Sequence, residues 1–157
     1  MNRSAIFSGC RRYRYVLWRV WDDSRPWILV IGLNPSTADE RHDDATSRVC
    51  IHYAQRWGYG GLALANLFAW CATKPAGLYR ATDPVGPDND SHLHRLIDGA
   101  EEVLCAWSDH GGYRDRDREV LRMIPHPQCL THLKSGRPGH PLYKRRELRP
   151  VALRIAG

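Results

Sequence analysis

The sequence has no apolar run long enough to cross a membrane, and no proper hydrophobic segment near its start. The first fifteen residues, MNRSAIFSGCRRYRY, contain only a short apolar patch. These two absences argue against a helical membrane protein and predict that the chain carries no signal peptide. We therefore expect a cytoplasmic protein with no membrane partner.

The chain also has no Cys-x-x-Cys pair, which argues against a zinc or iron–sulfur site. Its five cysteines are scattered, and their odd number suits reduced thiols in a cytoplasm. Six histidines show no paired spacing that suggests a metal. We expect neither a metal nor a cofactor. The cysteines are Cys10, Cys50, Cys71, Cys105 and Cys129, and these histidines are His42, His52, His92, His94, His126 and His132.

Glycine-rich nucleotide fingerprints are missing as well. The stretches GYGG and HGG match neither a P-loop nor a dinucleotide motif, so we interpret both as turns. There are no internal repeats or low-complexity segments. A length of 157 residues, with 43% apolar and 25% charged residues, predicts one ordinary soluble domain that spans residues 1–157. We expect it to be a monomer.

Acidic residues are absent from residues 1–21, which hold five arginines. Residues 130–157 hold seven basic residues and one acid, Glu147. The segment between them has 11 basic and 16 acidic residues, a net charge of −5, although the whole chain carries +6. If the two basic ends meet in space, they form one positive face suited to nucleic acid. The alternative is a pair of solvated tails that bind nothing.

Hydrophobic patterning predicts strands that alternate with helices. The stretch YRYVLWRVW (13–21) alternates, whereas WILVIGL (27–33) is a continuous apolar run, as in a strand covered on both faces. We expect these two strands to pair as a hairpin. Further strands are predicted at 62–68, 102–107 and 128–133, and helices at 43–58, 83–100 and 113–124. This order predicts an α/β fold, a three-layer sandwich with a mostly parallel four-stranded central sheet and an N-terminal antiparallel strand.

Polar or aromatic residues follow four of the predicted strands. They are Asn34, Asn66 near the end of the strand 62–68, Trp107 with Ser108 and His110, and His140. Ligands of open α/β sheets bind beyond the carboxyl ends of the strands. The sequence therefore predicts a pocket at this edge of the sheet. The alternative is that these are ordinary polar loops.

Several long motifs cover nearly the whole chain. They are YRYVLWRVW, LNPSTAD, DDAT, WGYGGLALANLFAW, ATKP, DPVGPDND and HPLY. Together they resemble a bacterial and phage family classed as a domain of unknown function (number 1643). This resemblance implies no activity.

Four short motifs carry a second, more distant resemblance. They are GLNP at Asn34, ALANLFAW at Asn66, VLCAWSDHG at Trp107 and GHPLY at His140. Their order is similar to that of the uracil-DNA glycosylase superfamily. The resemblance implies that superfamily's α/β fold, and hydrolysis of the N-glycosidic bond of a damaged or modified base, of uracil type, in DNA.

Three positions depart from the superfamily's pattern. Asn34 stands where an aspartate could polarise water, Ser108 replaces a glycine, and Tyr143 replaces the second proline of the last loop. The iron–sulfur cysteines of some members are not matched. The departures bear on the rate and the substrate of the implied reaction.

The residues suggest how that reaction could proceed. Breaking an N-glycosidic bond leaves an anionic base, which a donor aimed in advance can stabilise. His140 would donate to the base carbonyl, and the amide of Asn66 suits a Watson–Crick edge. Asn34 can hold a water but cannot take its proton. Asp44 is our candidate for the general base.

Asp39 and Asp43 are alternative general bases. The stretch DDAT also works as a helix start, because acids are favoured at helix N-termini. We favour that structural interpretation for Asp43, and for Asp44 both interpretations stay open. Phe68 or Trp70 could stack on a base, although a place in the core is the favoured alternative.

The remaining predicted site residues concern recognition of DNA, single- or double-stranded. Trp107 and Ser108 join Asn66 and Phe68 as predicted base-binding residues. The predicted nucleic-acid contacts are Ser36, Arg137, Tyr143, Lys144, Arg145 and Arg146. Two other functions fit the same sequence: a binding module that holds a nucleotide or nucleic acid without cutting it, and a hydrolase of free modified nucleotides.

Overall fold

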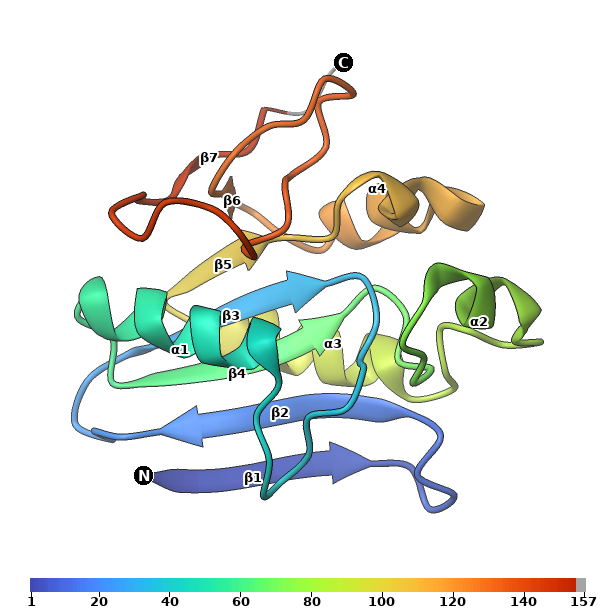
Figure 1. Ribbon diagram of the computed structural model, residues 1–157, viewed down its shortest axis with the longest axis horizontal. Coiled ribbons are helices and arrows are strands. Elements are labelled where there is room, and N and C mark those ends of the chain that lie inside the picture. Colours follow the sequence, from blue (N-terminus) through green and yellow to red (C-terminus); the bar gives the residue numbers. More distant parts are fainter. Residues whose placement is uncertain (155–157) are drawn as a thin grey trace.

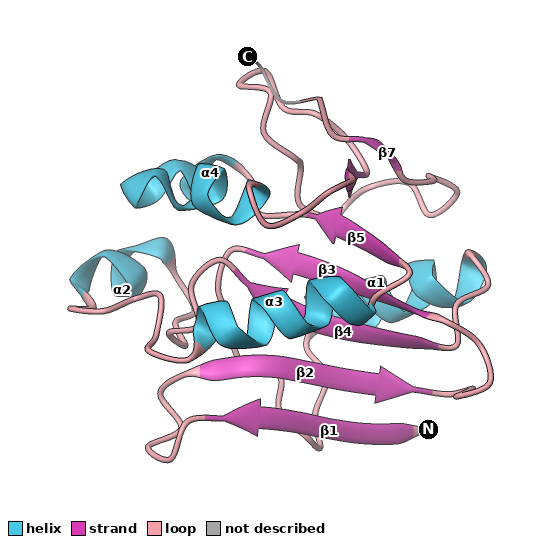
Figure 2. Cartoon of the chain, turned by 180° about the vertical axis from the view of Figure 1, so that it is seen from behind, coloured by secondary structure: helices cyan, strands magenta, loops and turns pink. Residues whose placement is uncertain are grey.

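The computed structural model describes residues 1–154, and in this part the chain forms an α/β fold around one mixed seven-stranded sheet. The strands lie in the order β1-β2-β4-β3-β5-β6-β7. Helix α1 covers one face, and α3 and α4 pack on the other, which gives three layers (Figures 1 and 2). The elements are β1 (Asn2–Phe7), β2 (Arg14–Val20), β3 (Trp27–Gly32), α1 (Ala45–Arg56), β4 (Gly61–Asn66), α2 (Pro75–Arg80), α3 (Asn89–Gly99), β5 (Glu102–Cys105), the 3₁₀ helix η1 (Asp109–Asp115), α4 (Arg116–Leu121), β6 (Pro127–Cys129) and β7 (Val151–Ala152).

The centre of the sheet is parallel. Strands β4, β3, β5 and β6 are neighbours and run in the same direction. Strand β2 joins β4 antiparallel, β1 joins β2 antiparallel, and β7 joins β6 antiparallel. Apolar side chains of β3 alternate between two cores: Leu29 and Ile31 pack in the core under α3, and Ile28 and Val30 pack in the core under α1. A strand covered on both faces needs a continuous apolar sequence, which explains the run at 27–33.

The predicted hairpin between 13–21 and 27–33 is wrong. Strand β2 pairs with β1 and β4, and β3 lies between β4 and β5. The crossover through α1 inserts β4 between the two strands expected to pair. The turn after β2 is fixed by Gly60, the residue before β4, because the N–H groups of Trp21 and Asp22 both donate to its carbonyl. Strands β1 and β7 were not predicted, because one is a polar edge strand and the other has only two residues.

The helix predicted at 43–58 forms as α1. Asp44 is its N-cap, and a capping box links Asp44 and Ser47 in both directions. Gly58 follows the helix with φ +87°, the left-handed conformation in which glycine commonly ends a helix. The single helix predicted at 113–124 is wrong. It is divided into η1 and α4 by Arg114 and Asp115, whose φ values are +56° and +54°.

Candidate functional site

A cavity of about 370 Å³ lies at the carboxyl ends of the parallel strands. The arrowheads of β3, β4 and β5 all point to this side of the molecule (Figure 1). Of the predicted site residues, the structure brings Asn34, Ser36, Asp44, Asn66, Trp107, Ser108 and His140 together in its wall. Arg14, Thr46, Lys74 and His110 also line it.

Asn66 is the last residue of β4, and its side chain is buried in the wall of the cavity. Its backbone carbonyl accepts a hydrogen bond from Asn89, but its side-chain amide has no protein partner in residues 1–154. Gly32 lies opposite on β3, where a Cβ atom would come 2.9 Å from the Asn66 Oδ1. The glycine therefore makes room for an amide whose donor and acceptor are both free to bind a ligand.

Asn34 is held in place by its amide nitrogen. Nδ2 donates to the carbonyl of Ala72 at 2.8 Å and to that of Pro35 at 3.1 Å. An aspartate here would place a carboxylate oxygen against two carbonyl oxygens, so the local structure favours asparagine. The Oδ1 of Asn34 has no protein partner among the described residues, and it can accept a hydrogen bond from a water or a ligand.

His140 also lines the cavity, on the loop after β6. Its Nδ1 accepts from the backbone N–H of Leu142 at 3.1 Å, so in the neutral ring Nε2 carries the proton. Burial lowers the pKa of His140, and Lys144 lowers it further, although Asp44 opposes the shift. The ring is therefore a neutral imidazole that presents one N–H donor.

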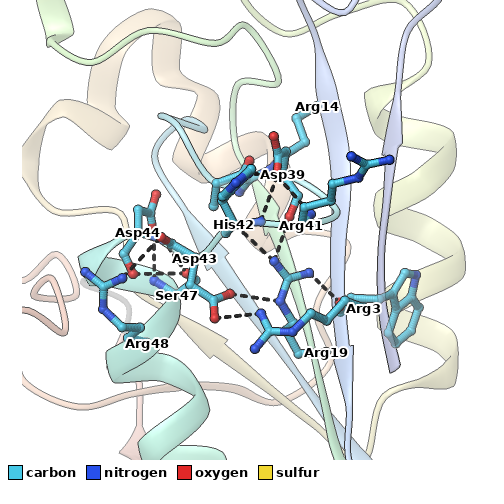
Figure 3. A network of polar contacts seen from close by, with 12 residues as sticks. Arg3, Arg14, Arg19, Asp39, Arg41, His42, Asp43, Asp44, Ser47 and Arg48 are labelled. Carbon is cyan, nitrogen blue, oxygen red and sulfur yellow. Dashed lines mark hydrogen bonds and ion pairs between the residues drawn. The ribbon is translucent and has the colours of Figure 1, made fainter. Parts of the chain in front are cut away.

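Asp44 combines a structural role with a place in the cavity wall. Its Oδ1 accepts from the Ser47 N–H at 2.8 Å, and no hydrogen bond to Oδ2 is found in the described chain (Figure 3). Both interpretations of this residue therefore stay open: it caps α1, and it keeps one carboxylate oxygen free to accept a proton.

Asp39 and Asp43, the alternative general bases, do not line the cavity. The Asp43 carboxylate accepts from Arg19 at 2.9 Å and from Arg3 at 2.8 Å (Figure 3). Burial acts to raise the pKa of Asp43, but these hydrogen bonds hold it below its ordinary value. Asp39 accepts from the backbone of Arg41 and His42. Both acids are therefore committed to the loop that leads into α1.

Trp107 and Ser108 enter the wall directly after β5. The Trp107 side chain is buried, and its indole N–H has no hydrogen-bond partner in the part of the chain described. Ser108 adopts φ +63° and ψ −166°, a region that glycine occupies freely and other residues do not. The backbone is therefore strained at Ser108, the position at which the superfamily pattern has glycine.

Other predicted residues lie outside the cavity. Phe68 is fully buried in the core against Tyr113, so it is not placed to stack on a base there. Trp70 packs against Tyr13. Arg137 donates to Asp117 at 2.9 Å on the rim of a separate hollow. Phe68 and Trp70 therefore serve packing, which was the favoured alternative for both.

The basic residues after His140 lie on the surface beside α1. Tyr143 is 97% exposed. Of the three basic residues that follow it, Lys144 is half-buried, and Arg145 and Arg146 are exposed. The segment is anchored by backbone carbonyls, since Tyr53 donates to that of Arg145. The Nε of Arg145 lies 3.9 Å from a carboxylate oxygen of Glu147, whereas Lys144 and Arg146 make no ion pair with any described residue.

The two basic ends do not merge through the sheet into one positive face. Strands β1 and β7 occupy opposite edges of it (Figure 1). Arg3 and Arg19 are engaged by Asp43, and Arg11 pairs with Glu40, so acids from the middle of the chain offset the N-terminal arginines. A charge count along the sequence cannot show these pairings.

Sequence reasoning missed Arg14 and Lys74. Arg14 is the first residue of β2, in a strand in which no ligand residue was expected, and the strand pattern gives no sign that it is buried. Lys74 stands in ATKP, a motif that was noted only for family resemblance. Their presence in the wall makes basic residues outnumber the single acid there, Asp44.

Fold and cavity define an α/β protein with a cavity at the carboxyl edge of its parallel strands. Residues 14–142 match the family described as Protein of unknown function (DUF1643), and the chain belongs to this family. No curated protein and no solved structure matches the chain. Within residues 1–154, no helix is long and apolar enough to span a membrane, and no group of three or more His, Cys, Asp or Glu residues could hold a metal ion.

Proposed function

We propose that this protein binds a nucleobase in the cavity and hydrolyses its N-glycosidic bond, with a damaged or modified base in DNA as substrate. The observation that carries the proposal is that a free amide on Asn66 and a neutral N–H donor on His140 share one cavity. The parallel strand order β4-β3-β5-β6, with the four motifs at its carboxyl edge, supports a fold of the uracil-DNA glycosylase type.

In this proposal Asn66 reads the edge of the base. Its amide offers one acceptor and two donor hydrogens, and Gly32 leaves it room in the wall. When the bond between the sugar carbon and the base nitrogen breaks, the electron pair moves into the base. The His140 Nε2–H then stabilises the negative charge on the base carbonyl.

Water completes the reaction. The Asn34 Oδ1 holds the water, and the free Oδ2 of Asp44 takes the proton as the water oxygen attacks the sugar carbon. The base anion is protonated on release. Asp44 thereby supplies the carboxylate that Asn34 cannot.

A DNA substrate would have to flip its base into the cavity, which costs a few kcal/mol. Lys144 and Arg146, beside α1, would offset that cost by binding backbone phosphates. Replacing Lys144, Arg145 and Arg146 by Ala should weaken DNA binding about equally for all sequences and reduce its dependence on salt. DNA binding that does not change with salt would contradict this part of the proposal.

The test is base release from oligonucleotides, single- and double-stranded, that carry a panel of damaged or modified bases, followed by alkaline cleavage of abasic sites. Losing one donor to a developing anion costs about 100- to 1000-fold in rate. His140→Ala should slow release by that factor with little loss of affinity, whereas His126→Ala, at an exposed position, should not. Asn66→Asp should change which base is accepted, because it exchanges donors for an acceptor.

Free modified nucleotides are a second candidate substrate. Two observations favour them. The two basic ends of the chain lead into opposite edges of the sheet, at β1 and β7, and the basic residues Arg14 and Lys74 line the cavity itself. The same bases should therefore be tested as nucleosides and nucleotides, with released base measured by chromatography. Binding without release from any of these substrates would identify a binding module and refute hydrolysis.

A further inference from the structure

Three arginines are buried in the described structure, and they differ in what compensates their charge. Arg19 pairs with Asp43 at 2.9 Å. Arg116 pairs with Asp90 at 2.6 Å and with Glu119 at 2.7 Å. Arg14 is 4% exposed and makes no ion pair with any described residue. A buried charge without a partner is costly, so a missing anion is expected beside Arg14.

The hydrogen bonds of Arg14 are also incomplete. A guanidinium has five N–H donors, and Arg14 Nη1 donates to the Ala38 carbonyl at 3.0 Å. This is the one side-chain hydrogen bond found for Arg14 in residues 1–154, and its buried Nε has no partner. Burial lowers the pKa of Arg14, while Asp44 acts against the shift. The charge of the Asp44 carboxylate acts to raise the pKa of Arg14 against the effect of burial, but the carboxylate makes no hydrogen bond to the guanidinium.

Arg14 lines the same cavity as Asn66 and His140. Lys74, at the start of α2, adds a second positive charge from another part of the chain. Asp44 is the one acidic residue in this wall, and its Oδ1 is engaged by the cap of α1. Planar guanidinium donors suit the oxygens of phosphate, which can accept two parallel hydrogen bonds.

We propose that Arg14, assisted by Lys74, forms an anion subsite in this cavity that binds the terminal phosphate of a mononucleotide. This inference rests on the second candidate substrate, the free modified nucleotide, and it names the form in which the base arrives. A terminal phosphate presents three oxygens on one side and can approach a buried guanidinium. A phosphodiester inside DNA carries a sugar on each side, which hinders it from reaching a side chain that is 4% exposed.

Thermal unfolding tests the subsite directly, with inorganic phosphate as the first probe. Phosphate binds the folded state and should raise the Tm of the wild-type protein progressively with concentration. The rise should vanish in Arg14→Gln and diminish in Lys74→Ala. Lys134→Ala is the matched control, because Lys134 is exposed and does not line the cavity. If Arg14→Gln does not fold, Arg14→Lys and Lys74→Ala still test the subsite.

Calorimetry then identifies the source of the phosphate. A nucleoside 5′-monophosphate should bind about 10- to 100-fold more tightly than its nucleoside, as charge-assisted hydrogen bonds allow. An oligonucleotide with the same base at an internal position should not show this gain. A gain for the oligonucleotide equal to that for the monophosphate would overturn the terminal-phosphate assignment. An unchanged wild-type Tm in phosphate, with equal affinities for nucleoside and monophosphate, would overturn the subsite itself.

The outcomes for the two proposals are distinct. Phosphate-dependent binding without base release would leave the subsite intact and refute hydrolysis. Base release from the nucleoside 5′-monophosphate that is equal in wild-type and Arg14→Gln protein would support hydrolysis and refute the subsite.

Discussion

Ser108→Gly should make the protein more stable, although it removes a side chain. Ser108 holds φ +63° and ψ −166° between β5 and η1, and its N–H donates to the Pro138 carbonyl at 2.9 Å, which fixes the backbone there. No hydrogen bond to its hydroxyl is found in the described residues, so the strain is not compensated by the side chain. Glycine adopts this backbone freely because it has no Cβ.

The size of the effect follows from two opposing terms. Relief of the strain contributes about 1–3 kcal/mol, and the greater freedom of glycine in the unfolded chain costs about 0.4–1 kcal/mol. The net stabilisation is therefore about 1 kcal/mol, which raises Tm by roughly 2–4 °C for a chain of this length.

Thermal and urea unfolding measure this prediction, and Ser108→Ala is the control. Alanine keeps the Cβ and therefore the strain, so its Tm should stay close to that of the wild type. A Ser108→Gly protein no more stable than Ser108→Ala would refute the strain argument. A rate assay of base release tests whether the Ser108 hydroxyl also binds the ligand. Both variants lack this hydroxyl, so a role in binding should lower the rate of Ser108→Gly and Ser108→Ala equally.

Three further predictions concern titratable groups. Asp44→Asn should keep the cap of α1 and its stability but lose about 10²- to 10⁴-fold in base release, whereas Asp44→Ala should also lose about 1 kcal/mol of stability; equal rates in Asp44→Asn and wild type would remove Asp44 as the base. His140 should titrate below its ordinary pKa in NMR, because burial, and then Lys144, lower its pKa. With that sign, its contribution to stability is fully present above the unfolded pKa of about 6.5 and is lost as pH falls toward the folded pKa; a ring that titrates higher would contradict this. Cys10 should be the first thiol to react with Ellman's reagent, because it is exposed and hydrogen bonds from Ser8, then Arg12, lower its pKa, whereas burial raises that of Cys50 to about 12. Cys10→Ser should remove the fast phase, and a fast phase that persists in this variant would refute the assignment.

Local patterns in the sequence determined much of the fold. The apolar run at 27–33 predicted a strand covered on both faces, and DDAT was interpreted as a helix start, which is where α1 begins. The positions of Asn34, Asn66, Trp107 and His140 after four successive strands predicted that they would meet, and they line one cavity. These predictions succeed because a parallel sheet aligns the carboxyl ends of its strands whatever the details of packing.

Tertiary structure decided the properties that depend on partners distant in sequence. The pairing of β2 with β4 required the crossover through α1, which no local pattern encodes. Asp43 was removed from the candidate bases by Arg3, which lies 40 positions away. Arg14 is one more arginine in the sequence, and only folding shows that it is buried without a carboxylate. The cost of burying a charge depends on which groups surround it in space. The sequence could therefore predict where the cavity lies, but not that a buried arginine without an ion pair lines it.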